Sequence, residues 1–374
     1  MRSDSLPRCA ALAALMLGGA VGCQVILGID SDVPIVTEGS TPCDPNQVDD
    51  DPNHCGACGH SCLGAACSAG TCQPVVLATF SGVPTDVALD ADFVYWSTED
   101  GTVRRVAKNG QGEAILISGI TPGIARIAVD DTRVYFRERS DNNGTPSIRA
   151  ANKDGTSPLL VASNQPGRAG LALGGGALLW ARTDDTNVGG IQRAVIDGSG
   201  NVTVKAITAQ DLQFPQEVAA DGDSVFWGQD TTGQVWRAAA DGSGQPAQLY
   251  GCGEYVNAIA IDAANAYWTT DSGEVFTAQK GDSISTGCSA ASARALASSS
   301  SASALGVAVG GDLVVWTIPS LGQVRATAKS GACSPPPCER QLAGSQASPG
   351  RIAADTRAAY WLNAGDGTVA KVAF

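Results

Sequence analysis

Four charged residues share one position in a repeated sequence pattern, and they are the candidates for binding chemistry. Each lies ten residues before an aromatic residue that ends an apolar run; the four are Asp86, Arg126, Glu217 and Arg351. The three equivalent positions hold the small residues Gly170, Ala258 and Gly306. Two carboxylates and two guanidinium groups can form ion pairs with one another around bound water, or the arginines can hold a small polar or peptide ligand. The sequence leaves both interpretations open.

Histidine chemistry is excluded from most of the chain. The two histidines, His54 and His60, both precede residue 75, so residues 75–374 contain no imidazole to act as a general base or a metal ligand. Paired-carboxylate motifs, phosphate-binding glycine loops and calcium-binding loops are missing as well. We therefore expect no catalytic residue, no metal and no cofactor. The alternative is an envelope lyase or hydrolase with carboxylates or a bound metal at the four charged positions.

The repeated pattern predicts the fold. Seven aromatic residues recur every 40 to 48 residues: Trp96, Phe136, Trp180, Trp227, Trp268, Trp316 and Trp361. This interval is typical of a four-stranded propeller blade. In the first copy we expect strands at 87–90, 93–97, 102–107 and 113–117, because the turns between them contain Asp-Gly and Asn-Gly, which favour tight hairpins. The prediction is an all-β protein.

The seventh copy indicates how the ring closes. Its third apolar segment, residues 368–373, ends one strand short of a full sheet at the end of the chain. A matching apolar segment precedes the first copy, at residues 75–80. Pairing the two would remove an exposed sheet edge. Residues 75–374 are therefore predicted to form a seven-bladed β-propeller that the N-terminal strand 75–80 closes.

Two aromatic segments carry a family resemblance. Tyr95-Trp96-Ser-Thr-Glu99 and Tyr267-Trp268-Thr-Thr-Asp271 resemble the repeats of YWTD-type and related β-propellers. That family typically has six blades and this chain has seven copies, so the resemblance implies a fold class and no ligand. The constant place of the tryptophans within a strand favours packing between sheets over a binding surface.

Cysteine usage indicates an oxidising compartment, because the chain has twelve cysteines. Cys9 and Cys23 lie in the N-terminal segment, and the other ten are expected to form five disulfides: Cys43, Cys55, Cys58, Cys62, Cys67, Cys72, Cys252, Cys288, Cys333 and Cys338. A short bridge between Cys333 and Cys338 leaves Cys252 for Cys288. The expected strands place that second pair at opposite rims of the propeller, and the long insert at residues 281–293 could span the gap between them.

Residues 54–73 are predicted to be a small cysteine-rich module, which is too short to fold without cross-links. His54, Cys55, Cys58, His60 and Cys62 could instead bind zinc, but an oxidising compartment favours disulfides. The patterns Asn-x-Cys-Gly-x-Cys-Gly and Gly-x-x-Cys within residues 53–72 resemble the Stig1-like family. The resemblance covers some 20 residues and implies an extracytoplasmic module rather than a reaction.

Residues 1–22 are predicted to be a lipoprotein signal peptide, with a basic start and an apolar run too short to span a membrane. Ala20-Val21-Gly22-Cys23 resembles a bacterial lipobox, which implies cleavage before Cys23 and acylation of that residue. Gln24, by the same resemblance, implies the outer membrane. Residues 23–53 are expected to be a lipid anchor and an acidic tether. An ordinary signal peptide with a soluble product is the alternative.

The net charge of −13 argues against nucleic acid as a partner. We expect attachment to the membrane through the lipid anchor, and a partner that is another envelope protein, a peptide or a glycan. The combined features are similar to bacterial lipoproteins of the myxobacterial type. The predicted function is non-catalytic ligand or protein binding, or scaffolding, in the cell envelope. A passive coat protein is a third possibility.

Overall fold

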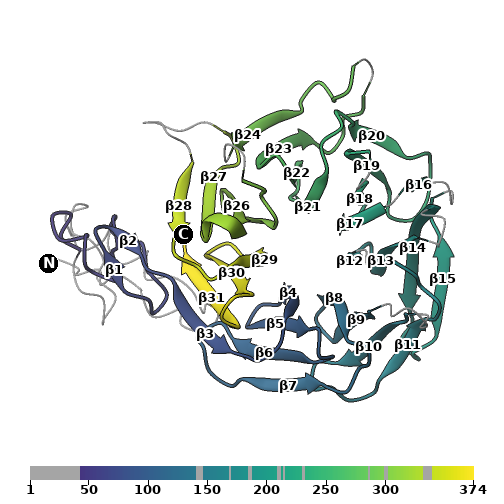
Figure 1. Cartoon of the computed structure of the whole chain (residues 1–374), viewed down its shortest axis with the longest axis horizontal. Coiled ribbons are helices and arrows are strands. Elements are labelled where there is room, and N and C mark those ends of the chain that lie inside the picture. Colours follow the sequence, from purple (N-terminus) through teal and green to yellow (C-terminus); the bar gives the residue numbers. More distant parts are fainter. Residues whose placement is uncertain are drawn as a thin grey trace, which may run out of the picture. The chain divides into compact units, whose positions relative to one another are not determined.

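The computed structural model describes residues 43–139, 146–167, 170–183, 188–208, 212–213, 215–229, 232–284, 287–298, 302–331 and 339–374. The chain separates into two compact units, residues 1–44 and 45–374. The second unit contains a small cysteine-rich module and seven sheets arranged around a common centre (Figure 1). These sheets are the blades of a β-propeller, which confirms the predicted fold.

Each blade is an antiparallel sheet. In blades 1 to 6 the four main strands follow the chain from the centre outward, and in blade 7 the outermost strand comes from earlier in the chain (Figure 1). Blades 1 and 2 consist of β4 (Pro84–Leu89), β5 (Phe93–Thr98), β6 (Val103–Ala107) and β7 (Ala114–Ile117), then β8 (Ile124–Val129), β9 (Arg133–Glu138), β10 (Ile148–Asn152) and β11 (Leu159–Ala162). Blades 3 and 4 consist of β12 (Leu171–Gly174), β13 (Ala177–Thr183), β14 (Val188–Ile196) and β15 (Val202–Ala206), with β16 (Leu212–Gln213) added to β14, then β17 (Pro215–Ala220), β18 (Ser224–Gln229), β19 (Gln234–Ala239) and β20 (Ala247–Tyr250).

Blades 5 to 7 repeat the arrangement. They consist of β21 (Val256–Ile261), β22 (Asn265–Thr270), β23 (Glu274–Gln279) and β24 (Arg294–Ser298), then β25 (Val307–Gly310), β26 (Leu313–Ile318), β27 (Gln323–Ala328) and β28 (Arg340–Ala343), then β29 (Pro349–Ala354), β30 (Ala358–Asn363), β31 (Thr368–Ala373) and β3 (Val75–Thr79). A short 3-10 helix, η1 (Pro319–Leu321), follows β26. In the described part of the chain, no helix has both the length and the apolar character needed to cross a membrane.

The ring closes as predicted. β3 pairs antiparallel with β31, with Val75 opposite Lys371 and Thr79 opposite Thr368. The outer strand of blade 7 therefore comes from the start of the propeller, and its other three strands come from the C-terminal end.

The tryptophans form the core between blades. The six that end the inner apolar runs, Trp96, Trp180, Trp227, Trp268, Trp316 and Trp361, are 0% exposed. Trp227 of blade 4, for example, packs with Leu179 and Ile191 of blade 3. Their burial supports the packing interpretation, since a binding surface would need exposed rings.

The disulfide between Cys252 and Cys288 confirms the expected pairing. The two cysteines are bonded, with their Cα atoms 5.0 Å apart, although the strand pattern places them at opposite rims. The segment after β23 returns along the outer strand of blade 4: Ile284 N–H donates to the Gln248 carbonyl over 2.8 Å, and Gly251 N–H donates to the Cys288 carbonyl over 2.8 Å. This extra pairing brings Cys288 to the end of β20.

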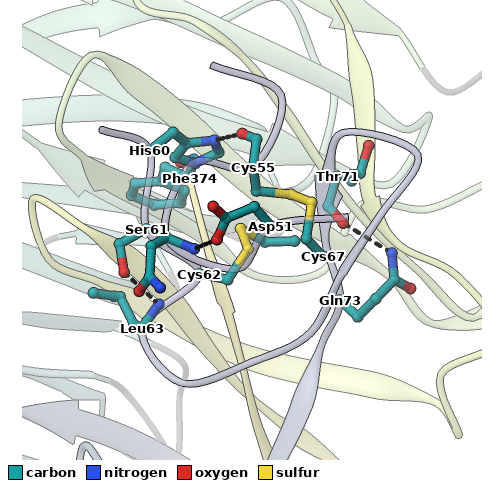
Figure 2. The surroundings of a disulfide bond; sticks show 12 residues. Asp51, Cys55, His60, Ser61, Cys62, Leu63, Cys67, Thr71, Gln73 and Phe374 are labelled. Atoms are coloured by element: carbon teal, nitrogen blue, oxygen red, sulfur yellow. Dashed lines mark hydrogen bonds between the residues drawn. A yellow bond between two sulfur atoms is a disulfide. The ribbon is translucent and has the colours of Figure 1, made fainter. Parts of the chain in front are cut away.

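The cysteine-rich module is cross-linked as expected. Cys55 bonds to Cys67 and Cys62 bonds to Cys72 around the short hairpin of β1 (Cys67–Ser68) and β2 (Thr71–Cys72), as Figure 2 shows. Cys43 and Cys58 are also disulfide-bonded. The thiolates that a zinc site would require are thus consumed in disulfides. The predicted lipidation site Cys23 and the predicted pair Cys333 and Cys338 lie outside the described residues.

The module contacts the end of the propeller. Figure 2 shows the ring of His60 between the carbonyl groups of Cys55 and Phe374, and it hydrogen-bonds to both. The ammonium group of Lys371 in β31 donates to the Leu63 carbonyl over 3.0 Å. Within the module, residues assigned to the tether from the sequence also contribute hydrogen bonds, because the carbonyl of Val48 accepts the Gly56 N–H over 2.8 Å.

Candidate functional site

Three of the four charged candidates meet at the centre of the ring. Arg126 lies in β8 of blade 2, Glu217 in β17 of blade 4 and Arg351 in β29 of blade 7. Nη2 of Arg126 is 2.8 Å from Oε1 of Glu217, and Nη2 of Arg351 is 2.6 Å from the same oxygen. The three side chains are 16%, 14% and 21% exposed. We call these residues, together with Asp86, the axial cluster.

Asp86 attaches to the same region through the backbone. It lies in β4 of blade 1, and its Oδ2 accepts the N–H of Ile127 in blade 2 over 3.0 Å. Arg126 also bonds to the backbone, since its Nη1 donates to the Ala125 carbonyl over 3.0 Å. The ten-residue spacing thus placed all four candidates at the inner strands. Ligand binding by them stays a prediction.

Small residues at the equivalent positions make room for these long side chains. A Cβ atom added at Gly170 would lie 3.0 Å from the backbone nitrogen of Val218 and 3.5 Å from Oε2 of Glu217. At Gly306 it would lie 2.9 Å from the carbonyl oxygen of Gly350. Inner strands of adjacent blades therefore approach closely at these two positions, and the charged side chains extend into the space left over.

The electrostatics of the axial cluster are dominated by burial and by the two arginines. Burial favours a neutral Glu217, but attraction from Arg351 and Arg126 outweighs it and lowers the pKa of Glu217 to about 2. Burial raises the pKa of Asp86 above its usual 3.8, against the attraction of the same arginines. For Arg351, burial is outweighed by Glu217, which raises the pKa of its guanidinium. Glu217 is therefore ionised at neutral pH, and Asp86 takes up a proton more readily than an exposed aspartate does.

The axial cluster offers charged hydrogen-bonding groups. Its four side chains include two guanidinium donors and two carboxyl groups, with no hydroxyl, thiol or imidazole to act as a nucleophile or base of ordinary pKa. Charge-assisted hydrogen bonds from arginine suit a carboxylate or another polar acceptor.

A fifth charged residue was missed from the sequence. Arg137 in β9 is 0% exposed, and its guanidinium donates to the carbonyl groups of Ala181, Gln165 and Pro166 over 2.8 to 2.9 Å. Burial lowers its pKa to about 9. It joins blades 2 and 3 through backbone oxygens. The available signal was its position directly after the aromatic Phe136, where the other six copies have uncharged residues: Ser97, Ala181, Gly228, Thr269, Thr317 and Leu362.

No family model matches the chain, and no curated protein matches it. Solved structures of several proteins are similar to it. A streptogramin B lyase structure has 10% identity, covers 80% of this chain and 96% of its own, and superposes with a TM-score of 0.59. Virginiamycin B lyase from Staphylococcus aureus has 12% identity, 81% and 98% coverage and a TM-score of 0.60. The WD40 repeats of RRP9 have 13% identity, 80% and 97% coverage and a TM-score of 0.62. At these identities the likeness shows the propeller fold alone.

Proposed function

We propose that this chain is a non-catalytic binding protein of the bacterial cell envelope whose axial cluster holds a polar or anionic ligand. The observation that carries the proposal is the pair of arginines that share one oxygen of Glu217. Nη2 of Arg351 donates to Glu217, while its other nitrogens have no hydrogen-bond partner among the described residues. Donors held in place but left unused can bind an acceptor with little loss of conformational entropy.

Binding is favoured over turnover by the absence of histidine from the propeller. Among the similar structures is a catalytically inactive virginiamycin B lyase in which a histidine is replaced by alanine, solved with quinupristin. In this chain, residues 75–374 contain no histidine that could serve such a reaction. WD40 propellers share the fold as well, so the architecture itself is compatible with a binding or scaffold role.

Neutralising the whole axial cluster is expected to abolish ligand binding while the fold persists. We would replace Asp86→Asn, Arg126→Gln, Glu217→Gln and Arg351→Gln together, because neutralising all four residues leaves no unpaired buried charge. The assay is capture of partners from solubilised envelope with the purified protein, followed by mass spectrometry. Partners held by the wild type should be lost, and circular dichroism should stay unchanged.

The matched control is Arg104→Gln with Glu113→Gln, which removes an ion pair of blade 1 with a separation of 3.4 Å far out from the inner strand. This variant should retain every partner. Equal capture by the quadruple variant would show that partners bind elsewhere on the propeller, and the proposed site would be wrong.

The envelope anchor is part of the proposal and has its own test. The support for it is the lipobox-like sequence before Cys23 and the even number of remaining cysteines. Intact mass measurement of the protein from membranes is expected to show a chain that begins at Cys23 and carries a diacylglycerol group. A mature chain without lipid would indicate an exported soluble protein instead.

A further inference from the structure

Adjacent blades are joined by a recurrent ion pair, which we call the inter-blade ion pair. An aspartate in the turn after the innermost strand of one blade accepts from a lysine that directly follows the third strand of the next blade. The pairs are Lys108 with Asp355 at 2.8 Å, Lys153 with Asp90 at 2.8 Å, Lys329 with Asp262 at 3.2 Å, and Lys280 with Asp221. In each case the lysine Nζ contacts Oδ2 of the aspartate.

Strand register identifies the equivalent positions in the other blades. In blade 1, Trp96 lies opposite Arg104, and the lysine follows four residues later at Lys108. The same count places Ile196 in blade 3, Ala240 in blade 4 and Phe374 in blade 7 at the lysine position. The aspartate lies six residues before the aromatic residue, and Gly174 and Gly310 occupy that position in blades 3 and 6.

At two interfaces both partners are replaced together. Ala240 of blade 4 faces Gly174 of blade 3, and Phe374 of blade 7 faces Gly310 of blade 6. A Cβ atom at Gly310 would lie 2.8 Å from the ring of Phe374, so an aspartate has no room there. At these two interfaces, neither a carboxylate nor an ammonium group occupies the equivalent positions. This avoids an uncompensated charge.

The interface between blades 2 and 3 differs from the other six, because only one of the two partners is replaced. Asp130 of blade 2 is retained, but the lysine position of blade 3 holds Ile196. Oδ1 of Asp130 accepts the N–H groups of Thr132 and Arg133, both over 2.7 Å, and Oδ2 accepts the Tyr135 hydroxyl over 2.7 Å. Asp90 makes the equivalent bonds and also holds Lys153 on Oδ2. Among the described residues, no ammonium or guanidinium group forms an ion pair with Asp130.

A cavity occupies the place of the missing lysine. Its volume is about 450 Å³, and Asp130, Tyr135, Asn152, Ile196 and Asp197 are among the residues that line it. Apolar walls come from Leu173 and Leu178 as well as Ile196, and Arg133 is its one cationic lining residue. The cavity thus combines a carboxylate at the position that binds a lysine in other blades with apolar side chains that an alkyl chain can contact.

We propose that this cavity binds a primary alkylammonium group, which places its nitrogen on Oδ2 of Asp130 and its carbon chain against Ile196. The four intact interfaces show the same carboxylate position holding the same chemical group, supplied there by the protein itself. The ligand is either a free amine or diamine, or a lysine side chain of a partner, since both present this chemistry. Asp130 follows the end of β8, whereas Arg126 of the axial cluster lies in the first half of that strand. The amine site is therefore separate from the axial cluster and does not depend on the proposed function.

A metal ion fits the cavity less well than an ammonium group. In the described part of the chain, the one group of three potential metal ligands within 4.8 Å of one another is Cys55, Cys62 and Cys72, which belong to disulfides. The described residues that line the cavity offer two carboxylates, Asp130 and Asp197, and no glutamate, histidine or cysteine that could complete a metal site. An ammonium needs a single carboxylate oxygen and donates its remaining hydrogens to neighbouring acceptors.

Calorimetric titration of the purified full chain tests the site. The probes are 1,5-diaminopentane and Nα-acetyl-lysine amide, with 1-pentanol as the uncharged counterpart. We expect at least one amine to bind and the alcohol not to bind. Asp130→Asn keeps an acceptor for the turn but removes the charge, and it should weaken amine binding at least about tenfold, the effect of losing a charge-assisted hydrogen bond. Asp92→Asn, an exposed carboxylate in the corresponding turn of blade 1, should change nothing.

Ile196→Lys supplies the missing partner from within the chain. It should abolish amine binding and raise the melting temperature, because it recreates the inter-blade ion pair of the other blades. Binding of the diamine alone would identify a small amine as the ligand, and binding of the lysine amide alone would identify a lysine-bearing partner. The proposal is overturned if neither amine binds, if both variants bind amine as the wild type does, or if calcium chloride binds where the amines do not.

Discussion

Deleting residues 75–80 is expected to destroy cooperative folding of the propeller rather than to remove one strand from it. β3 supplies the outer strand of blade 7, and its loss leaves the full length of β31 as an unpaired edge. The deletion also removes Leu77 and Ala78, which are 8% and 7% exposed and pack with Trp96 and Leu362. We expect a loss above about 5 kcal/mol, beyond the range of ordinary single substitutions. Urea unfolding followed by tryptophan fluorescence measures it.

A pair of substitutions within β3 keeps this prediction testable if the deleted chain does not fold at all. Leu77→Ala leaves a cavity in the closing strand and should cost about 2–4 kcal/mol. Val76→Ala changes the neighbouring side chain, which is 53% exposed, and should cost less than about 0.5 kcal/mol. An unchanged unfolding midpoint for the deletion, or equal effects of the two substitutions, would show that closure by β3 contributes little to stability.

The strands of the propeller were predictable because their signals are local. A hairpin depends on a few residues, such as the turn at Asp100 and Gly101, where Gly101 adopts a φ of +82° and a Cβ atom would lie 1.9 Å from the Ile120 carbonyl oxygen. The repeat of this pattern then predicted the ring and its closing strand. The path of the segment before Cys288 was not predictable in this way, because it has no periodic pattern and pairs with the edge of another blade.

For the candidate site, its position and the formation of ion pairs within it were predictable, but which groups pair was not. The ten-residue spacing placed Arg126, Glu217 and Arg351 at equivalent points of different blades. The sharing of one Glu217 oxygen by both arginines depends on distances across the ring, which no local pattern contains. The inter-blade ion pairs were missed for the same reason. Lys108 and Asp355 are 247 residues apart, and their relation emerges only when the registers of all blades are aligned.

Replacing Glu217→Gln is expected to destabilise the protein by about 3 kcal/mol at neutral pH. Glu217 is the one carboxylate that pairs with both Arg126 and Arg351, so the change leaves two buried guanidinium groups that repel each other. Removing one partner of a buried ion pair typically costs about 3–5 kcal/mol. Glu113→Gln is the control, because the exposed Glu113 lies 3.4 Å from Arg104, and a surface pair of this kind contributes less than about 1 kcal/mol. Chemical unfolding at pH 7 compares the two variants.

The stabilisation from Glu217 should also disappear in acid. The pKa of Glu217 is lowered from 4.5 to about 2 in the folded protein, so its contribution is fully present above pH 4.5 and is lost as the pH falls toward 2. A shift of this size corresponds to about 3 kcal/mol. Asp86 acts in the opposite direction, because its raised pKa makes the folded state take up a proton more readily, which adds stability as the pH falls. Because both proteins contain Asp86, its contribution largely cancels when the unfolding free energy of Glu217→Gln is subtracted from that of the wild type. This difference should shrink between pH 4.5 and 2, and a constant difference would mean that the two arginines do not hold Glu217 ionised.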